Sequence, residues 1–354
     1  MENLISQFCS IGNSALAAMS GGVDSAVAAM LAIRGGLDCA GAIMKLHDFN
    51  RESVSDAGAA ADKLGIPFHV LDFTGVFNAR VIKRFADAYN EGITPNPCVD
   101  CNKYIKFGCL LEKARELGRN SVVTGHYARI EHSAGGRILL KKGIDPVKDQ
   151  SYVLYGLTQE QLAHICFPLG GLSKQQVREL ALSEGLENAD KRESQDICFV
   201  TDGDYAGFIE RFSGEAPRSG RFIDPDGNCL GQHKGITRYT IGQRHGLGLA
   251  MPYPAYVLEI RPEDDTIVVG RNELLYSKIF HVRDVNLISA EYLSSPVRAY
   301  VKVRYKQIEQ PATVYQTGDD AAYIEFDEPQ RAITKGQAAV IYDGDYVIGG
   351  GTII

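Results

Sequence analysis

Short apolar runs alternate with helical patterns along the first third of the chain. The apolar runs have the length and composition of β-strands, and they occur at residues 14–19, 39–44, 67–73 and 121–126. Between them, apolar residues recur with helical spacing at residues 23–34, 54–65, 74–89 and 104–118. This alternation is typical of α/β domains, and it predicts a parallel sheet with helices on its faces.

Two capping boxes mark the starts of further helices. Thr158 precedes Gln161 by three residues, and Ser173 precedes Gln176 by the same spacing. In a capping box the hydroxyl accepts a hydrogen bond from the third helical amide, and the glutamine side chain bonds back to the capping residue. We expect both helices to extend the first domain rather than to open a new one.

Beyond about residue 205 the pattern changes to short β runs broken by turns. DPDG at 224–227 and PEDD at 262–265 are turn sequences, and the second of them separates two apolar runs. Asp343-Gly344, between AAVIY and YVIGG, is a strong hairpin signal. The pattern predicts a small β-rich domain, followed from about residue 280 by a barrel-like β domain.

One stretch of that last domain, residues 297–306, alternates apolar and basic positions. The apolar face includes Tyr305, and the other face combines Tyr300 with the basic residues Arg298, Lys302, Arg304 and Lys306. Two interpretations are open, namely a half-buried strand with a solvated outer face or a contact surface for a phosphate backbone. By this pattern Tyr305 is a core residue.

Composition limits the classes of function. The 354 residues include 44 acidic and 37 basic side chains, so a nucleic acid would have to bind a local basic surface. No apolar run is long enough to span a bilayer, and the first basic residue is Arg34, so we expect a cytoplasmic protein that does not associate with membranes. Eight cysteines without a signal peptide favour reduced thiols over a disulfide framework.

The segment SGGVDS, residues 20–25, connects a predicted strand to a predicted helix. Its small residues let backbone N–H groups and the positive end of the helix dipole converge on a phosphate. The lysine of a P-loop is absent, which argues against the usual ATPase cradle. The segment resembles the pyrophosphate-binding loop of the N-type ATP pyrophosphatases. That resemblance implies cleavage of ATP between the α and β phosphates, with transfer of AMP to a carbonyl oxygen.

Three cysteines are candidates for sulfur chemistry. Cys98 and Cys101 form a C-x-x-C motif ahead of a basic helix, and Cys198 lies in a short apolar run. A zinc site would need a second pair of ligands at a recognisable spacing, and no second C-x-x-C motif occurs. A thiolate beside Lys103 and Lys106 would have a lowered pKa and could act as a nucleophile. Taken alone, a cysteine in the position of Cys198 is more often a buried core thiol.

Six motifs occur in the order seen in the tRNA-specific 2-thiouridylases of the MnmA family, namely SGGVDS, NPCVDCNKYIKF, GHYAR, KDQSYVL, SQDICF and IGQRHGLG. The chain resembles that family over essentially its whole length. The resemblance implies a Rossmann-like ATP pyrophosphatase domain at residues 1–205. It also implies a small β-rich central domain at 206–278 and a C-terminal β-barrel at 279–354 that contacts tRNA.

The same resemblance implies roles for individual residues. Cys101 would be the catalytic cysteine, and Cys198 would carry sulfur as a persulfide. The nucleotide site would comprise Ala18, Met19, Ser20, Gly21, Gly22, Val23, Asp24, Ser25, Met44 and Gly125. The target base would lie against Asn96, Pro97 and Cys98, and further tRNA contacts would come from His126, Lys148, Asp149, Gln150, Arg304, Tyr305 and Gln337. From the residues alone, His126 could instead be a core histidine, and residues 148–150 could form a plain capping turn.

The implied reaction uses ATP and Mg²⁺ to adenylate the C2 oxygen of the wobble uridine in the anticodon arm of tRNA. Sulfur from a persulfide, supplied by a donor protein, then gives 2-thiouridine. Cys98 stands where many family members have an acidic residue. With Cys101 and Cys198 it would supply three thiolates, so a sulfide-binding [4Fe-4S] cluster is an alternative. An amide-forming ligase and a non-catalytic RNA-binding or sulfur-carrier protein are the rival functions.

Overall fold

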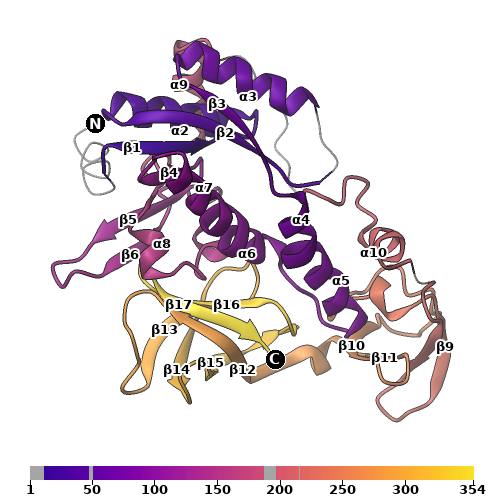
Figure 1. The fold of residues 1–354 in the computed structure, drawn as a ribbon. Helices are drawn as coiled ribbons and strands as arrows, with labels where there is room; N and C mark the ends of the chain where they lie inside the picture. Colours follow the sequence, from indigo (N-terminus) through magenta and orange to yellow (C-terminus); the bar gives the residue numbers. More distant parts are fainter. Residues whose placement is uncertain (1–11, 48–50, 187–196, 215) are drawn as a thin grey trace.

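A computed structural model describes residues 12–47, 51–186, 197–214 and 216–354. Its N-terminal domain is built on a sheet with the strand order β3-β2-β1-β4-β7, in which all neighbouring strands are parallel (Figure 1). The strands are β1 Ser14–Ala18, β2 Asp38–Lys45, β3 Phe68–Asp72, β4 Ser121–Val123 and β7 Ile165–Cys166. The predicted parallel sheet is therefore confirmed, and β7 adds an edge strand that the sequence pattern did not indicate.

The central strand β1 has side chains in two hydrophobic cores. Ala15 and Ala17 pack in the core formed with helices α2, α3 and α9, which are Val23–Arg34, Arg51–Leu64 and Lys174–Ser183. Leu16 points to the opposite core, formed with the helix that ends at α7 and with residues 152–167. Helix α8, Gln159–Leu162, and helix α9 both begin with the predicted capping boxes. Helices thus cover both faces of the sheet.

Two composite helices lie between the sheet and the β domains. The first joins α4 Thr74–Phe77, the π-helical segment η1 Asn78–Ile82 and α5 Lys83–Asn90, and it runs toward the central domain (Figure 1). The second joins α6 Pro97–Asp100, the π-helical segment η2 Cys101–Cys109 and α7 Leu110–Glu116. Single π-helical turns recur at functional sites. The sequence predicted both helices but neither π-helical segment.

The central domain follows α10, Tyr205–Ser213, and contains a mixed sheet with the order β10-β11-β8-β9. Its strands are β8 Gly220–Ile223, β9 Cys229–His233, β10 Tyr256–Arg261 and β11 Thr266–Gly270. The DPDG turn joins β8 to β9, and the PEDD turn joins β10 to β11, as the sequence predicted. Short 3₁₀ turns at Ile236–Arg238 and Asn272–Leu275 complete this part of the chain.

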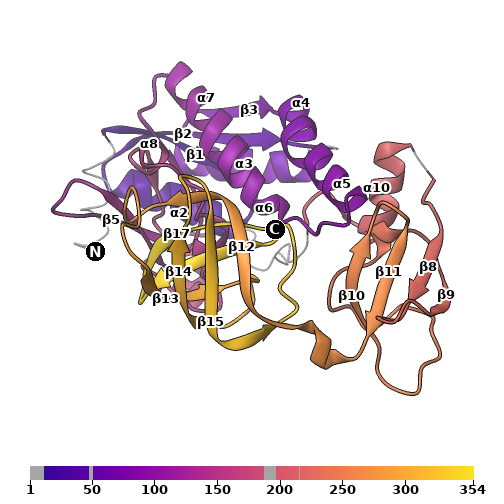
Figure 2. The same ribbon diagram turned by 90° about the horizontal axis from the view of Figure 1, so that it is seen from below.

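The C-terminal domain is an antiparallel barrel, closed by pairing of β12 with β17 (Figure 2). Its strands are β12 Tyr276–Leu287, β13 Val297–Lys302, β14 Gln310–Gln316, β15 Ala322–Arg331, β16 Ala338–Asp343 and β17 Tyr346–Ile353. Asp343-Gly344 forms the predicted hairpin. A second hairpin, β5 Ala128–His132 with β6 Ile138–Lys142, extends the barrel sheet from within the N-terminal domain. The sequence did not predict this extension, which ties the two domains together.

The expected basic strand at 297–306 is corrected by the structure. Strand β13 ends at Lys302, and Arg298 forms two bonds of 2.7 and 2.8 Å with the carboxylate of Asp327. Arg304 turns inward, where its Nη2 donates to the carbonyl oxygen of Ala332 at 2.9 Å. Tyr305 is 39% exposed rather than a core residue. The alternation failed because the strand ends before these residues, so Arg304 does not belong to a basic outer face.

Among the described residues, no helix has the length and apolar content required to cross a lipid bilayer.

Candidate active site at the ends of the parallel strands

The SGGVDS loop has the conformation expected of a phosphate-binding turn. Gly21 has a φ of +79°, and a Cβ atom there would lie 2.7 Å from the carbonyl oxygen of Ser53. Ser25 Oγ donates to the carbonyl oxygen of Gly22 at 2.9 Å and accepts from the amide of Ser20 at 3.0 Å. Helix α2 begins after Gly22 without a side-chain cap. Its N-terminal amides are therefore available to an anion.

Asp24 carries two hydrogen bonds that the sequence did not reveal. Its Oδ1 accepts from the hydroxyl of Tyr127 at 2.9 Å and from Nζ of Lys174 at 2.7 Å. The Lys174 side chain is only 12% exposed. Tyr127 lies within the GHYAR motif, and Lys174 directly follows the capping residue Ser173. These positions were the only features of the sequence that could have pointed to a contact with Asp24. The ion pair between Lys174 and Asp24 places an ammonium group beside the SGGVDS loop.

The other predicted nucleotide residues lie at the carboxyl edge of the sheet. Ala18 ends β1, Met44 lies near the end of β2, and Gly125 follows β4. Parallel sheets bind ligands at this edge. A Cβ atom on Gly125 would lie 2.9 Å from the carbonyl carbon of Asp24, so glycine permits close approach to α2. Met19 is 2% exposed and belongs to the core, and Val23 is also buried.

The composite helix α6–η2–α7, called the cysteine helix below, lies near the ends of β2 and β3, because Cys101 shares a hydrophobic cluster with Met44 and Phe73. Asn96 caps α6 by accepting from the amide of Cys98 at 3.2 Å, and Pro97 occupies the first helical turn. The helix then becomes π-helical from Cys101. Because i→i+5 hydrogen bonds place residues five apart above one another, Lys106 lies one turn beyond Cys101 on the same side. A regular α-helix would bring residues three or four apart together instead.

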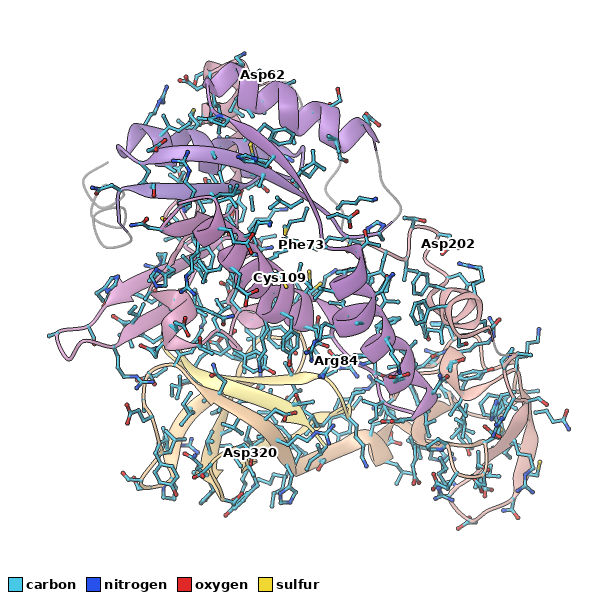
Figure 3. All side chains as sticks on the ribbon, in the orientation of Figure 1. Asp62, Phe73, Arg84, Cys109, Asp202 and Asp320 are labelled. Carbon is cyan, nitrogen blue, oxygen red and sulfur yellow. The ribbon has the colours of Figure 1, made fainter. Side chains whose placement is uncertain are left out.

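Cys101 lies in a hydrophobic cluster that also contains Phe199, the neighbour of Cys198 in sequence. Cys101 is 8% exposed and packs in the cluster formed by the two composite helices. Phe199, next to Cys198, packs edge-on against Phe77 and Phe85 of the same cluster, with ring centroids 5.8 and 5.3 Å apart. Cys198 itself is exposed. Figure 3 labels Arg84, Cys109 and Asp202, one residue on each of the three segments that contribute side chains to this cluster.

Among the residues that the structure describes, Lys106 is the cation whose charge acts on all three candidate thiols. Burial raises the pKa of Cys101 to about 12, and it also raises the pKa of Cys98 and of Cys198. The side chains of Cys98 and Cys198 are partly exposed to solvent, but protein atoms surround most of each sulfur atom. The ammonium of Lys106 lowers the pKa in all three cases. The lowered thiol pKa expected from the sequence is therefore wrong, because burial outweighs the charge of Lys106, and Lys103 is not among the main causes.

The alternative of an iron-sulfur cluster gains no support from this arrangement. Within the described ranges, no three His, Cys, Asp or Glu side chains are grouped closely enough to hold a metal ion. Cys101 is directed into an apolar cluster, whereas Cys98 and Cys198 keep solvent access. The thiols do affect one another, because Cys98 and Cys198 both raise the pKa of Cys101.

His126 is buried rather than presented to solvent. It is 6% exposed, and its ring lies 5.6 Å from the rings of Phe107 and Phe167. Burial lowers the pKa of His126 well below the ordinary value, and Lys106 lowers it further. The neutral ring joins Lys106 Nζ, 3.4 Å from Nε2, to the hydroxyl of Thr124, 2.7 Å from Nδ1. In this conformation His126 contacts Lys106 and does not reach the surface.

The predicted tRNA residues 148–150 meet the barrel loop that contains Tyr305. The carboxylate of Asp149 accepts from the amide and hydroxyl of Ser151, so the turn is capped as the plainer interpretation expected. Gln150 Oε1 accepts from the amide of Tyr127 at 3.0 Å. The Tyr305 hydroxyl donates to the carbonyl oxygen of Asp149 at 3.1 Å. Lys148 is half-buried beside them.

Gln337 joins the barrel to the cysteine helix. Its Nε2 donates to the carbonyl oxygens of Thr94 at 2.8 Å and Pro95 at 3.3 Å, just before Asn96. The amide of Thr94 donates back to the carbonyl oxygen of Lys335 at 3.0 Å. The structure therefore assigns Gln337 a position on the lead-in to the cysteine helix.

Known proteins resemble this chain over nearly its full length. Three family models match, described as a tRNA methyl transferase HUP domain at residues 13–202, a tRNA methyl transferase PRC-barrel domain at 206–271 and an aminomethyltransferase β-barrel domain at 277–353. The tRNA-specific 2-thiouridylase MnmA of Clostridioides difficile is 49% identical over 95% of this chain and 96% of that protein.

The chain belongs to the tRNA-specific 2-thiouridylase family.

A second family member, MnmA 1 of Caldanaerobacter subterraneus, is 46% identical over 97% of this chain and 98% of that protein. A solved 4-thiouridine synthetase–RNA complex with bound ATP is a distant likeness, with 19% identity, a TM-score of 0.38 and coverage of 57% of this chain and 50% of that one. The family resemblance seen in the six motifs is confirmed.

Proposed function

We propose that this chain uses ATP to transfer sulfur to C2 of the wobble uridine in the anticodon arm of tRNA, which gives 2-thiouridine. The observation that carries the proposal is the combination of an uncapped phosphate loop with the Cys101–Cys198 pair. An amide-forming ligase would need the loop but not the thiols. In this scheme residues 1–205 catalyse the reaction, and residues 206–278 and 279–354 hold the RNA.

Adenylation comes first, because the C2 oxygen is a poor leaving group. Transfer of AMP from ATP to that oxygen forms an O–P bond and releases pyrophosphate, whose charge the amides of the SGGVDS loop and Lys174 would bind. Magnesium typically takes one or two carboxylates together with phosphate oxygens. Asp24 is the carboxylate placed to face such an ion, which would offset the charge of the pyrophosphate.

Sulfur transfer then needs both cysteines. The terminal sulfur of a Cys198 persulfide attacks C2, and the C2–O bond to AMP breaks. The Cys101 thiolate next attacks Sγ of Cys198, so the S–S bond breaks and its electron pair remains on the sulfur of 2-thiouridine. Alternatively, Cys101 releases sulfide from Cys198 before the attack on C2. Both routes leave a Cys101–Cys198 disulfide, which a dithiol reductant must reopen.

The partners follow from this chemistry. A persulfide donor protein has to reach Cys198, whose side chain is exposed. A wobble base lies in a single-stranded loop and can be turned into a pocket without opening a duplex. We place that base against Asn96, Pro97 and Cys98, with the surrounding RNA on residues 148–150 and on the barrel. A cytoplasmic location fits these partners and the reduced thiols.

Gln337→Leu is expected to lower the kcat of thiolation about tenfold and to leave the KM for ATP unchanged. The substitution removes the donor that holds the carbonyl oxygens of Thr94 and Pro95, and each such bond contributes about 1 kcal/mol. Steady-state kinetics on unthiolated tRNA measure the effect, with Gln330→Leu as the matched control within the barrel. A raised KM for tRNA at an unchanged kcat would instead assign Gln337 to direct RNA contact.

Release of pyrophosphate from ATP should depend on tRNA. We expect pyrophosphate when unthiolated tRNA is added, and none with ammonia or amino acids as acceptors. A coupled pyrophosphate assay on the full chain measures this directly. Release with amino acids and without RNA would favour the ligase, and ATP binding without any tRNA-dependent release would favour a non-catalytic protein.

A further inference from the structure

Lys106 is a half-buried cation without a carboxylate partner among the described residues. Its Nζ lies 3.4 Å from Nε2 of His126, and its charge lowers the pKa of the thiols of Cys98 and Cys101 on its own helix and of Cys198 from the segment after α9. On the same helix, Asp100 is paired with Arg84, 3.3 Å from its guanidinium. A positive charge that has no carboxylate partner within the described part of the chain, and that acts on thiols, has the environment of a counter-ion for an anionic sulfur.

His126 fixes where that charge lies. Lysine only donates hydrogen bonds, so Nε2 of His126 must accept and the ring proton must lie on Nδ1, which donates to Thr124. The rings of Phe107 and Phe167 hold the imidazole from its sides. The π-helical segment supplies the second constraint, because it brings Lys106 to the side of the helix occupied by Cys101.

We propose that Lys106 is the counter-ion of the anionic sulfurs in this site and that His126 is its positioning residue. The role of Lys106 in catalysis rests on the proposed function, whereas its position is argued from the contacts described above. In the reaction, negative charge lies on the terminal sulfur of the Cys198 persulfide before attack and on Cys101 before it attacks Cys198. In both steps the ammonium favours the anionic form over the protonated one, without itself gaining or losing a proton.

The test is the rate of alkylation of Cys198 by iodoacetamide, measured across pH by site-resolved mass spectrometry on the full chain. We expect Lys106→Met to move the midpoint of the Cys198 profile upward by about one pH unit, and to slow alkylation at pH 8 about tenfold. Lys106→Arg should restore most of the effect. Lys103→Met, which removes a charge three residues earlier, should leave the profile unchanged. Cys229, exposed in β9, serves as the internal control.

A positioning role for His126 has its own signature. His126→Leu should reproduce part of the Lys106→Met shift, whereas His126→Gln, which retains an acceptor for Lys106, should shift the profile less. Both variants retain the lysine, so they keep the test decisive if Lys106→Met fails to fold. An unchanged Cys198 profile in Lys106→Met, or in His126→Leu if the former does not fold, would overturn the proposal.

The alkylation experiment needs neither ATP nor tRNA, so its outcome is separable from that of the proposed function. A shifted profile in a protein that forms no 2-thiouridine would retain the counter-ion and reject the reaction. In thiolation assays, Lys106→Met should lower kcat and leave the KM for tRNA unchanged. A rise in the KM for tRNA alone would show that Lys106 binds RNA instead, and it would contradict the proposal.

Discussion

Cys198→Ser is expected to reduce the formation of 2-thiouridine about a thousandfold or more, while tRNA-dependent release of pyrophosphate continues. A serine hydroxyl cannot carry a persulfide, so the adenylated uridine would form without a sulfur nucleophile to attack it. Nucleoside mass spectrometry and a pyrophosphate assay on the same reaction measure the two steps separately. Loss of both activities would show that Cys198 also takes part in adenylation or in folding.

Cys101→Ser should separate the two cysteine roles further. This variant should still accept one sulfur atom on Cys198 from a persulfide donor, which intact-protein mass spectrometry detects, but it should not complete a turnover. Cys229→Ser is the matched control, because Cys229 is exposed in the central domain and lies outside the site. A persulfide that accumulates on Cys101 in wild-type protein and not on Cys198 would reverse the assignment.

Gly125→Ala is expected to raise the KM for ATP tenfold or more, with little change in the KM for tRNA. The added methyl group would lie 2.9 Å from the carbonyl carbon and 3.0 Å from the carbonyl oxygen of Asp24, and backbone atoms cannot rotate away. The first turn of α2 would therefore move, and the SGGVDS loop with it. We expect the free energy of unfolding to fall by about 1–3 kcal/mol.

Gly75→Ala is the control for that substitution. No heavy atom lies within 4 Å of the added carbon at this position in α4, so ATP kinetics should be unchanged and stability should stay equal or rise slightly. Thermal unfolding and ATP titrations on both variants provide the comparison. An unchanged KM for ATP in Gly125→Ala would remove Gly125 from the nucleotide site.

Local patterns predicted local structure well in this chain. Both capping boxes form, and Asp343-Gly344 makes the expected hairpin, because each depends on hydrogen bonds between residues close in sequence. The parallel sheet was predictable for a similar reason, since strand and helix periods alternate regularly. The six motifs then identified the family, which composition and charge could not do.

Tertiary contacts account for what the sequence did not reveal. Strand alternation could not show that β13 ends at Lys302, and so it placed Arg304 on the wrong side. Strand β6 pairs with β17, although about 200 residues separate them, and no local pattern indicates that pairing. The contact between Lys174 and Asp24 also joins distant segments. The sequence placed both Lys103 and Lys106 near the thiols, and it could not distinguish them because the π-helical segment that brings Lys106 to the side of Cys101 was not predictable from residue spacing.

The measurement that tests the central claim most directly is nucleoside mass spectrometry of unthiolated tRNA after incubation with the full chain, ATP, Mg²⁺ and a persulfide donor. The account predicts new 2-thiouridine at the wobble position with wild-type protein, and none with Cys101→Ser. Absence of 2-thiouridine with wild-type protein, under both aerobic and anaerobic conditions and with a donor shown to load Cys198, would contradict it.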